Sequence, residues 1–105
     1  MINAPSKRFH PSEIVAIIHF AHEGEGLFLM GEWHGSQHQG VAEALNPLAA
    51  FFGIQFNKDT VCDPDDYWVS DLRYPIIQVF LEHYISTGIE RIYYYTGCSF
   101  EKRQI

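Results

Sequence analysis

The chain has 105 residues, of which 47% are hydrophobic and 15% aromatic, and its formal net charge is −6. This length favours one small domain, and the apolar content excludes an intrinsically disordered chain. Seven Lys and Arg residues against thirteen Asp and Glu are too few for sequence-independent nucleic-acid binding. The sequence has no signal peptide and no apolar run near the ~18 residues of a membrane span, which predicts a cytoplasmic protein. The thiols of Cys62 and Cys98 are then expected to be reduced, although a disulfide between them stays open.

The first predicted helix runs from about Pro11 to Glu23, after a short strand near Met1–Ala4. Proline is favoured at the first helical position because its missing N–H would be unpaired there anyway. Gly24 suits the carboxyl end of the helix. Apolar side chains recur between these ends at helical spacing, at Ile14, Ile17, Ile18 and Ala21.

The segment Leu27 to Met30 holds four apolar residues between glycines. Such a run is typical of a strand buried on both faces, as in a parallel sheet that is covered by helices. A polar loop follows, and ligands of open α/β sheets bind beyond the carboxyl ends of strands. We therefore expect the central strand of the fold here and a binding site in the loop that begins at Glu32.

A second helical segment begins over Val41 to Leu45. Pro47 cannot continue an uninterrupted helix, so Asn46 is predicted as the cap of a new helix that ends at Gly53. Segment 74–86 is ambiguous between a helix and an extended run. Strands are predicted over 54–56, 60–62 and 89–96, the last because it is rich in β-branched and aromatic residues.

The order of these elements resembles a known family. From Phe9 through Glu32, a helix, a glycine-rich turn and an apolar strand ending in glycine and an acid follow each other. The motifs LNPL, FGIQF, YPII, HYISTGI and YTGCSF continue the likeness along the chain. Together they resemble the GIFT-type domains of gliding-motility and intraflagellar transport proteins. Those domains belong to the class I glutamine amidotransferase-like, flavodoxin-like superfamily.

The resemblance implies an α/β fold, a three-layer sandwich with a mostly parallel sheet, lacking the first strand–helix unit of the family. Residues 1–105 would form a single, partial domain of this kind, with 74–80 extended. The resemblance also implies that the cysteine chemistry of the superfamily is lost. The catalytic cysteine would stand at the Gly31-Glu32-Trp33 end of the central strand, and no cysteine lies there.

The loop after the predicted central strand carries the candidate ligand-binding residues Glu32, Trp33, His34, Ser36 and His38. Within it, Glu32, His34 and His38 are candidate ligands of a divalent metal, because carboxylate and imidazole suit zinc. Ser36 beside two histidines also suggests a hydrolytic pair. A solvated, hydrogen-bonded loop is the alternative to both.

Other residues with suitable chemistry each have a structural alternative. A pair of helical histidines would be further metal ligands or surface residues, a cysteine would be a nucleophile or a buried thiol, and three aspartates would bind calcium or form a turn. These residues are His19 and His22, Cys98, and Asp63, Asp65 and Asp66.

The sequence favours a non-catalytic ligand- or protein-binding module that associates with itself. The alternative is a small hydrolase, metal-assisted or serine-type, that uses the loop after the central strand. No cofactor is expected apart from a divalent metal in that loop. Eight Phe, six Tyr and two Trp exceed what so small a core readily encloses. This predicts a homodimer, or a partner segment that completes the sheet, with contacts from Tyr93–Tyr95 or from 74–80.

Overall fold

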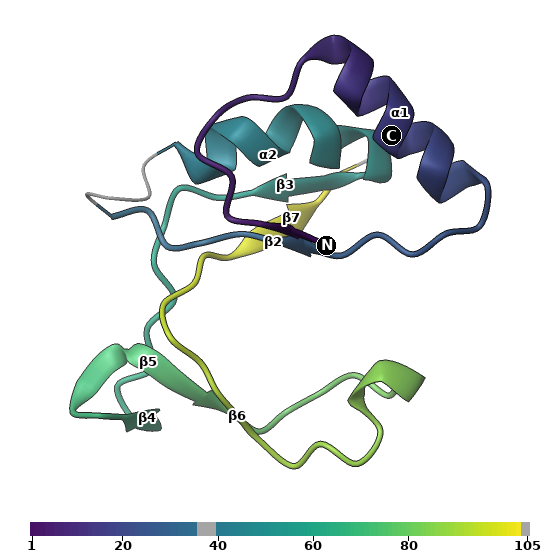
Figure 1. Ribbon diagram of the computed structural model, residues 1–105. Helices are drawn as coiled ribbons and strands as arrows, with labels where there is room; N and C mark the ends of the chain where they lie inside the picture. The colour runs from purple at the N-terminus through teal and green to yellow at the C-terminus, as the bar shows by residue number, and fades with distance from the viewer. Residues whose placement is uncertain (36–39, 104–105) are drawn as a thin grey trace.

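In the computed structural model, which describes residues 1–35 and 40–103, the chain forms two lobes joined by two extended segments (Figure 1). The first lobe contains β1 (Ile2–Asn3), α1 (Pro11–His22), β2 (Leu29–Met30), α2 (Val41–Ala49), the 3₁₀ helix η1 (Ala50–Phe52), β3 (Ile54–Phe56) and β7 (Phe100–Lys102). The second lobe contains β4 (Tyr67–Trp68), β5 (Asp71–Ile77), the 3₁₀ helix η2 (Tyr84–Ser86) and β6 (Ile92–Tyr93).

The predicted three-layer, mostly parallel sandwich is wrong. The strands of the described residues form three small sheets, and only β1–β2 is parallel, whereas β3–β7 and β4–β5–β6 are antiparallel. Parallel neighbours need a long crossover, but only two residues, Val69 and Ser70, separate β4 from β5. Both have a φ of 56°, the left-handed backbone of a tight hairpin turn, so the chain reverses there instead of crossing over.

Helix α1 is confirmed almost residue for residue, because its signals are local. The backbone N–H of His10 donates to the Glu13 carboxylate at 2.7 Å, and the His10 ring accepts from the backbone N–H of Ser12. This reciprocal cap fixes the first turn. However, none of the twelve residues of α1 is buried, so its apolar stripe lies only half-covered on the first lobe.

The segment Leu27 to Met30 is not a central strand buried on both faces. Only Leu29 and Met30 are in a strand, which pairs with β1 alone, and Phe28 is exposed. An apolar run predicts burial only where other elements of the chain cover it. Here β3 lies opposite without joining β2 in a ladder, and this leaves apolar side chains between them uncovered.

The buried apolar side chains of the first lobe belong to α2: Val41, Ala42, Ala44, Leu45, Leu48 and Ala49. The predicted break before Pro47 is wrong, because α2 continues through it. Instead of capping a helix, the Asn46 side chain bonds the backbone N–H and carbonyl of Phe56 in β3, at 2.8 and 3.0 Å. Gly53 closes η1 with a φ of 72°, as its position predicted.

Of the remaining predicted strands, 54–56 is confirmed as β3, and the predicted extended segment 74–80 is a strand over 74–77, the end of β5 (Asp71–Ile77). The strand over 60–62 is absent, and the predicted strand over 89–96 shrinks to Ile92–Tyr93. Thr96 has a φ of 53°, a left-handed conformation that turns the chain out of the sheet.

The two extended segments between the lobes, 57–61 and 97–99, are bonded to each other. The backbone N–H of Asn57 donates to the Ser99 carbonyl, and that of Val61 donates to the Gly97 carbonyl, both at 2.9 Å. The Asp59 carboxylate accepts from the Ser99 N–H at 2.7 Å and also from its hydroxyl. Within the described part of the chain, no helix is long and apolar enough to cross a membrane.

Candidate functional site

The carboxylate of Glu32, the first predicted ligand in the loop after β2, is already engaged. It accepts a hydrogen bond of 2.7 Å from the hydroxyl of Thr96 and one of 2.9 Å from the backbone N–H of Trp33. Glu32 is half-buried and Thr96 is buried. These contacts give Glu32 a structural role, tying the loop to the segment after β6.

Trp33 contacts both lobes. The Arg73 guanidinium of β5 lies 5.1 Å from the centre of its ring, within cation–π range. The backbone of Gly35 is packed so closely that a Cβ there would lie 2.5 Å from the ring. Trp33 therefore lies between the lobes, with its ring against Arg73 and Gly35.

His34 is exposed, and its backbone N–H donates to the Asp59 carbonyl at 2.9 Å. Ser36 and His38 lie outside the described residues. Of the five predicted site residues, the structure therefore describes three, and it does not bring their polar side chains together. No group of three His, Cys, Asp or Glu side chains among the described residues is placed to hold a metal ion.

The other candidates also occupy structural settings. His19 lies 3.0 Å from Glu23 one turn along α1, with both side chains exposed. The Asp63 carboxylate accepts from the backbone N–H groups of Asp65 and Asp66, which makes the predicted turn. Cys62 and Cys98 are both free thiols.

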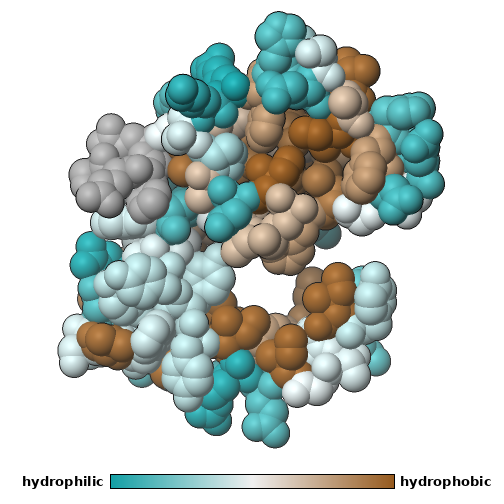
Figure 2. Space-filling model, viewed as in Figure 1, coloured by the Kyte–Doolittle hydropathy of each residue, from teal (hydrophilic) through white to brown (hydrophobic). Residues whose placement is uncertain are grey.

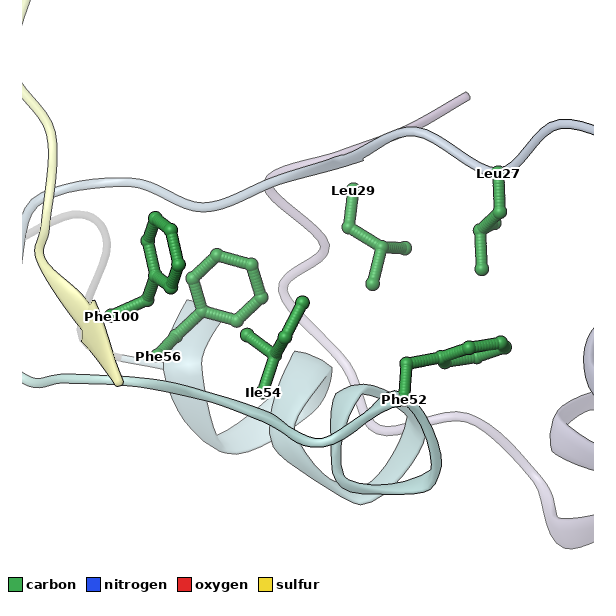
Figure 3. Close-up of a pocket in the computed structure, with 6 residues that line it drawn as sticks. All are labelled: Leu27, Leu29, Phe52, Ile54, Phe56 and Phe100. Atoms are coloured by element: carbon green, nitrogen blue, oxygen red, sulfur yellow. The ribbon is translucent and has the colours of Figure 1, made fainter. Parts of the chain in front are cut away.

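A pocket of about 300 Å³ lies between β2 and β3 in the first lobe. Its six lining residues are all apolar: Leu27, Leu29, Phe52, Ile54, Phe56 and Phe100. Figure 3 shows the two leucines pointing across the gap toward the isoleucine and the phenylalanines, with α2 on the far side of β3. Since α2 covers one face of β3, the opposite face carries the open pocket.

A second pocket of about 250 Å³ continues this surface, because Leu29, Phe56 and Phe100 line both. The further residues that it adds are Phe28, Met30, Gly31, Tyr94 and Cys98. We call the two pockets together the apolar groove. The backbone of Gly31 lies close to the Phe56 ring across the groove, because a Cβ at that position would lie 2.8 Å from the ring.

The two ionisable groups of the groove are held in their neutral forms. Burial raises the pKa of the Cys98 thiol, and the Asp59 carboxylate raises it further. Burial, followed by the Glu32 carboxylate, raises the pKa of Tyr94. A catalytic cysteine needs the opposite environment, one that lowers the pKa of its thiol. The groove is therefore suited to apolar contacts and gives Cys98 no activation as a nucleophile.

Three tyrosines, Tyr74, Tyr93 and Tyr95, form an aromatic cluster with Trp68. The Tyr74 and Tyr95 rings are stacked with centres 4.3 Å apart, and Trp68 lies 6.0 Å edge-on from Tyr93. The Trp68 ring N–H donates to the Tyr94 carbonyl at 2.6 Å. Tyr93 and Tyr95 thus belong to the aromatic cluster, while Tyr94 lines the groove.

Sequence reasoning missed the groove. Its residues come from three separate parts of the chain, 27–31, 52–56 and 94–100. The available signal was the apolar run Leu27 to Met30, which was interpreted as a core strand. No family model, curated protein or solved structure matches this chain.

Proposed function

We propose that this protein is a non-catalytic binding module whose apolar groove binds an apolar segment of a protein partner. The observation that carries the proposal is the continuous lining of the groove by aliphatic and aromatic side chains that its own helices leave uncovered. None of the described lining residues is charged. Uncovered apolar surface of this kind typically marks an interaction site.

A segment of chain fits the groove better than a small polar ligand. The larger pocket lies at the lower end of the range for small-molecule sites, and its described walls offer no side-chain hydrogen-bonding group to orient a polar compound. Two connected pockets instead suit successive apolar side chains on one segment. As part of this proposal we place the protein in the cytoplasm, where Cys62 and Cys98 would stay reduced.

The hydrolase alternative receives no support from the described residues, and we do not propose it. Glu32 is engaged by Thr96 and by the backbone of Trp33, and His34 is exposed. Among the described residues that line the apolar groove there is no histidine and no carboxylate. The described lining of the groove offers a partner apolar packing contacts.

Binding of the fluorescent probe anilinonaphthalene sulfonate to dilute protein tests the proposal. We expect saturable binding that shifts the methyl resonances of Leu27, Leu29 and Ile54 in a carbon–proton NMR spectrum. Phe100→Asp, which puts a charge at the groove, should weaken this binding. Val69→Asp is the matched control, since Val69 is similarly exposed and lies in the β4–β5 turn. Binding that shifts other methyl groups and spares these three would contradict the proposal.

A further inference from the structure

The segment that joins β5 to β6 projects from the second lobe (Figure 1) and exposes several apolar side chains. We call residues 78–91 the arm. Three of its apolar residues, Val79, Leu81 and Tyr84, expose 90%, 88% and 82% of their surface. Ile85 and Ile89 are exposed as well. So many exposed apolar side chains in one short segment are unusual for a surface that faces only water.

The arm is nevertheless ordered by its own hydrogen bonds. The Ser86 hydroxyl donates to the carbonyls of Leu81 and His83, at 2.9 Å each, and the His83 ring accepts from the backbone N–H of Ile85 at 3.1 Å. Gly88 ends the turn with a φ of 82°. An arm whose shape is already set loses little conformational entropy when it docks.

The whole chain exposes more surface than its mass requires. Its accessible area is 7722 Å² for 12.1 kDa, whereas a compact monomer of that mass exposes about 6,000 Å². Its radius of gyration is 15.0 Å, against about 13 Å for a compact domain of this length. The excess of about 1,700 Å² exceeds the about 800 Å² that each partner contributes to a stable interface. In Figure 2 the two lobes stand apart, and apolar residues border the opening on both.

The arm is not docked in the groove of its own chain, since its apolar side chains stay exposed. The groove lies in the first lobe and the arm in the second, and the joint between the lobes is braced at several points. The paired segments 57–61 and 97–99, the Thr96–Glu32 hydrogen bond and the Arg73 contact with Trp33 all span it. A second molecule meets no such restraint.

We propose that the occupant of the groove is the arm of a second copy of this chain, in a reciprocal two-fold dimer. This inference rests on the proposed function, since it names the partner of the same groove. One chain carries both surfaces, so a two-fold axis makes both contacts at once. The stretch Val79-Phe80-Leu81 is uncharged, as is the groove lining, so the net charge of −6 on each copy is not concentrated at the contact.

Sedimentation velocity of three variants tests the exchange of arms. Leu81→Asp places a charge on the arm, Phe100→Asp places one in the groove, and Val69→Asp is the matched control at an exposed site in the β4–β5 turn. We expect the parent and Val69→Asp to dimerise at micromolar concentration. Each of the other two should raise the dissociation constant by about a hundredfold, because it spoils both contacts of its dimer. Circular dichroism verifies that the variants are folded.

Mixing the two impaired variants gives the most specific result. The arm of Phe100→Asp and the groove of Leu81→Asp are both intact, so a heterodimer of the two variants retains one sound contact. An equimolar mixture should therefore dimerise at concentrations at which each variant alone is monomeric. A parent that stays monomeric at high concentration would overturn the inference. So would a Leu81→Asp variant that dimerises like the parent, or a mixture that shows no recovery.

The probe separates this inference from the proposed function. In the parent, binding of anilinonaphthalene sulfonate should decline as protein concentration rises, whereas monomeric Leu81→Asp should bind it at every concentration. A monomeric parent that binds the probe in the groove would overturn the dimer and leave the proposed function standing. Monomeric Leu81→Asp that binds no probe in the groove would overturn the proposed function itself.

Discussion

The hydroxyl of Thr96 donates a hydrogen bond of 2.7 Å to the carboxylate of Glu32, a residue 64 positions earlier in the chain. Thr96 is only 7% exposed and holds a left-handed backbone conformation. A β-branched residue adopts that conformation at a cost, which the surrounding contacts must offset. The pair therefore helps to fix the position of one lobe against the other. Substitutions of Thr96 that remove this hydrogen bond test its contribution.

Thr96→Val keeps the shape of the side chain and removes its hydroxyl. We expect the free energy of unfolding to fall by about 1–3 kcal/mol, because the half-buried Glu32 carboxylate loses a donor. Urea denaturation followed by circular dichroism measures the change. Thr96→Ser retains the hydroxyl and should lose less. A larger loss in Thr96→Ser than in Thr96→Val would show that the methyl group, and not the hydrogen bond, stabilises the joint.

Gly97 lies beside this pair and is buried against the Tyr94 ring. A Cβ at Gly97 would lie 2.6 Å from Cε1 of that ring. Gly97→Ala should lower the free energy of unfolding by about 1–3 kcal/mol, since the ring or the backbone must shift. Gly26→Ala is the control, because a Cβ there meets no atom within 4 Å among the described residues, and it should change stability by less than about 0.5 kcal/mol. A harmless Gly97→Ala would mean that Tyr94 moves freely in the groove.

Acid should weaken the fold through two exposed ion pairs. Hydrogen bonds from Arg73 hold the pKa of Asp71 below its ordinary 3.8, and Lys58 holds the pKa of Glu43 below its ordinary 4.5. A lowered pKa means that the folded state favours the charged carboxylate. The resulting stability is fully present above those ordinary values and is lost as pH falls through the lowered ones.

Urea midpoints measured from pH about 6 to pH about 3 should therefore decline, and Lys58→Gln should reduce the part of that decline due to Glu43. Both pairs are solvent-exposed, so each contribution is small and should shrink further in high salt. A Lys58→Gln variant with an unchanged acid profile would show that the pair does not form in solution.

Local signals predicted much of the secondary structure. Pro11 and Glu13 mark the start of α1 through contacts within four residues, and Gly53 supplies the left-handed backbone at the end of η1. The sheets could not be predicted in this way, because strand pairing depends on distant segments. The resemblance to a parallel-sheet family led to the wrong arrangement, whereas the hairpin at Val69 and Ser70 dictates an antiparallel one.

The candidate site shows the same division. Glu32 was chosen for its chemistry, but its distant partner Thr96 determines where the carboxylate points. The apolar runs at Leu27 to Met30 and at Val79 to Leu81 were evident in the sequence. Their lengths and composition do not tell whether the same chain or another one covers them. That depends on the position of every other element.

Core and groove residues should respond differently to truncation. Leu45 of α2 is fully buried, so Leu45→Ala should lower the free energy of unfolding by about 2–5 kcal/mol. Val15 on α1 is 66% exposed, and Val15→Ala should change it by less than about 0.5 kcal/mol. Urea denaturation of both variants measures this contrast. Similar losses of unfolding free energy in the two variants would mean that Val15 is buried, in contradiction to its exposed position on α1.

Leu29 lines the groove and is half-buried, which makes its truncation informative about what covers the groove. In dilute protein, Leu29→Ala should cost less than Leu45→Ala, because water already reaches part of the Leu29 side chain. At high concentration a docked second copy would exclude that water and be stabilised by Leu29, so the cost of Leu29→Ala should grow. The cost of Leu45→Ala should stay constant, since its site is closed within one chain. Urea midpoints measured over a roughly hundredfold range of protein concentration test both trends. A Leu29→Ala cost that does not change with concentration would show that the second copy leaves this part of the groove uncovered.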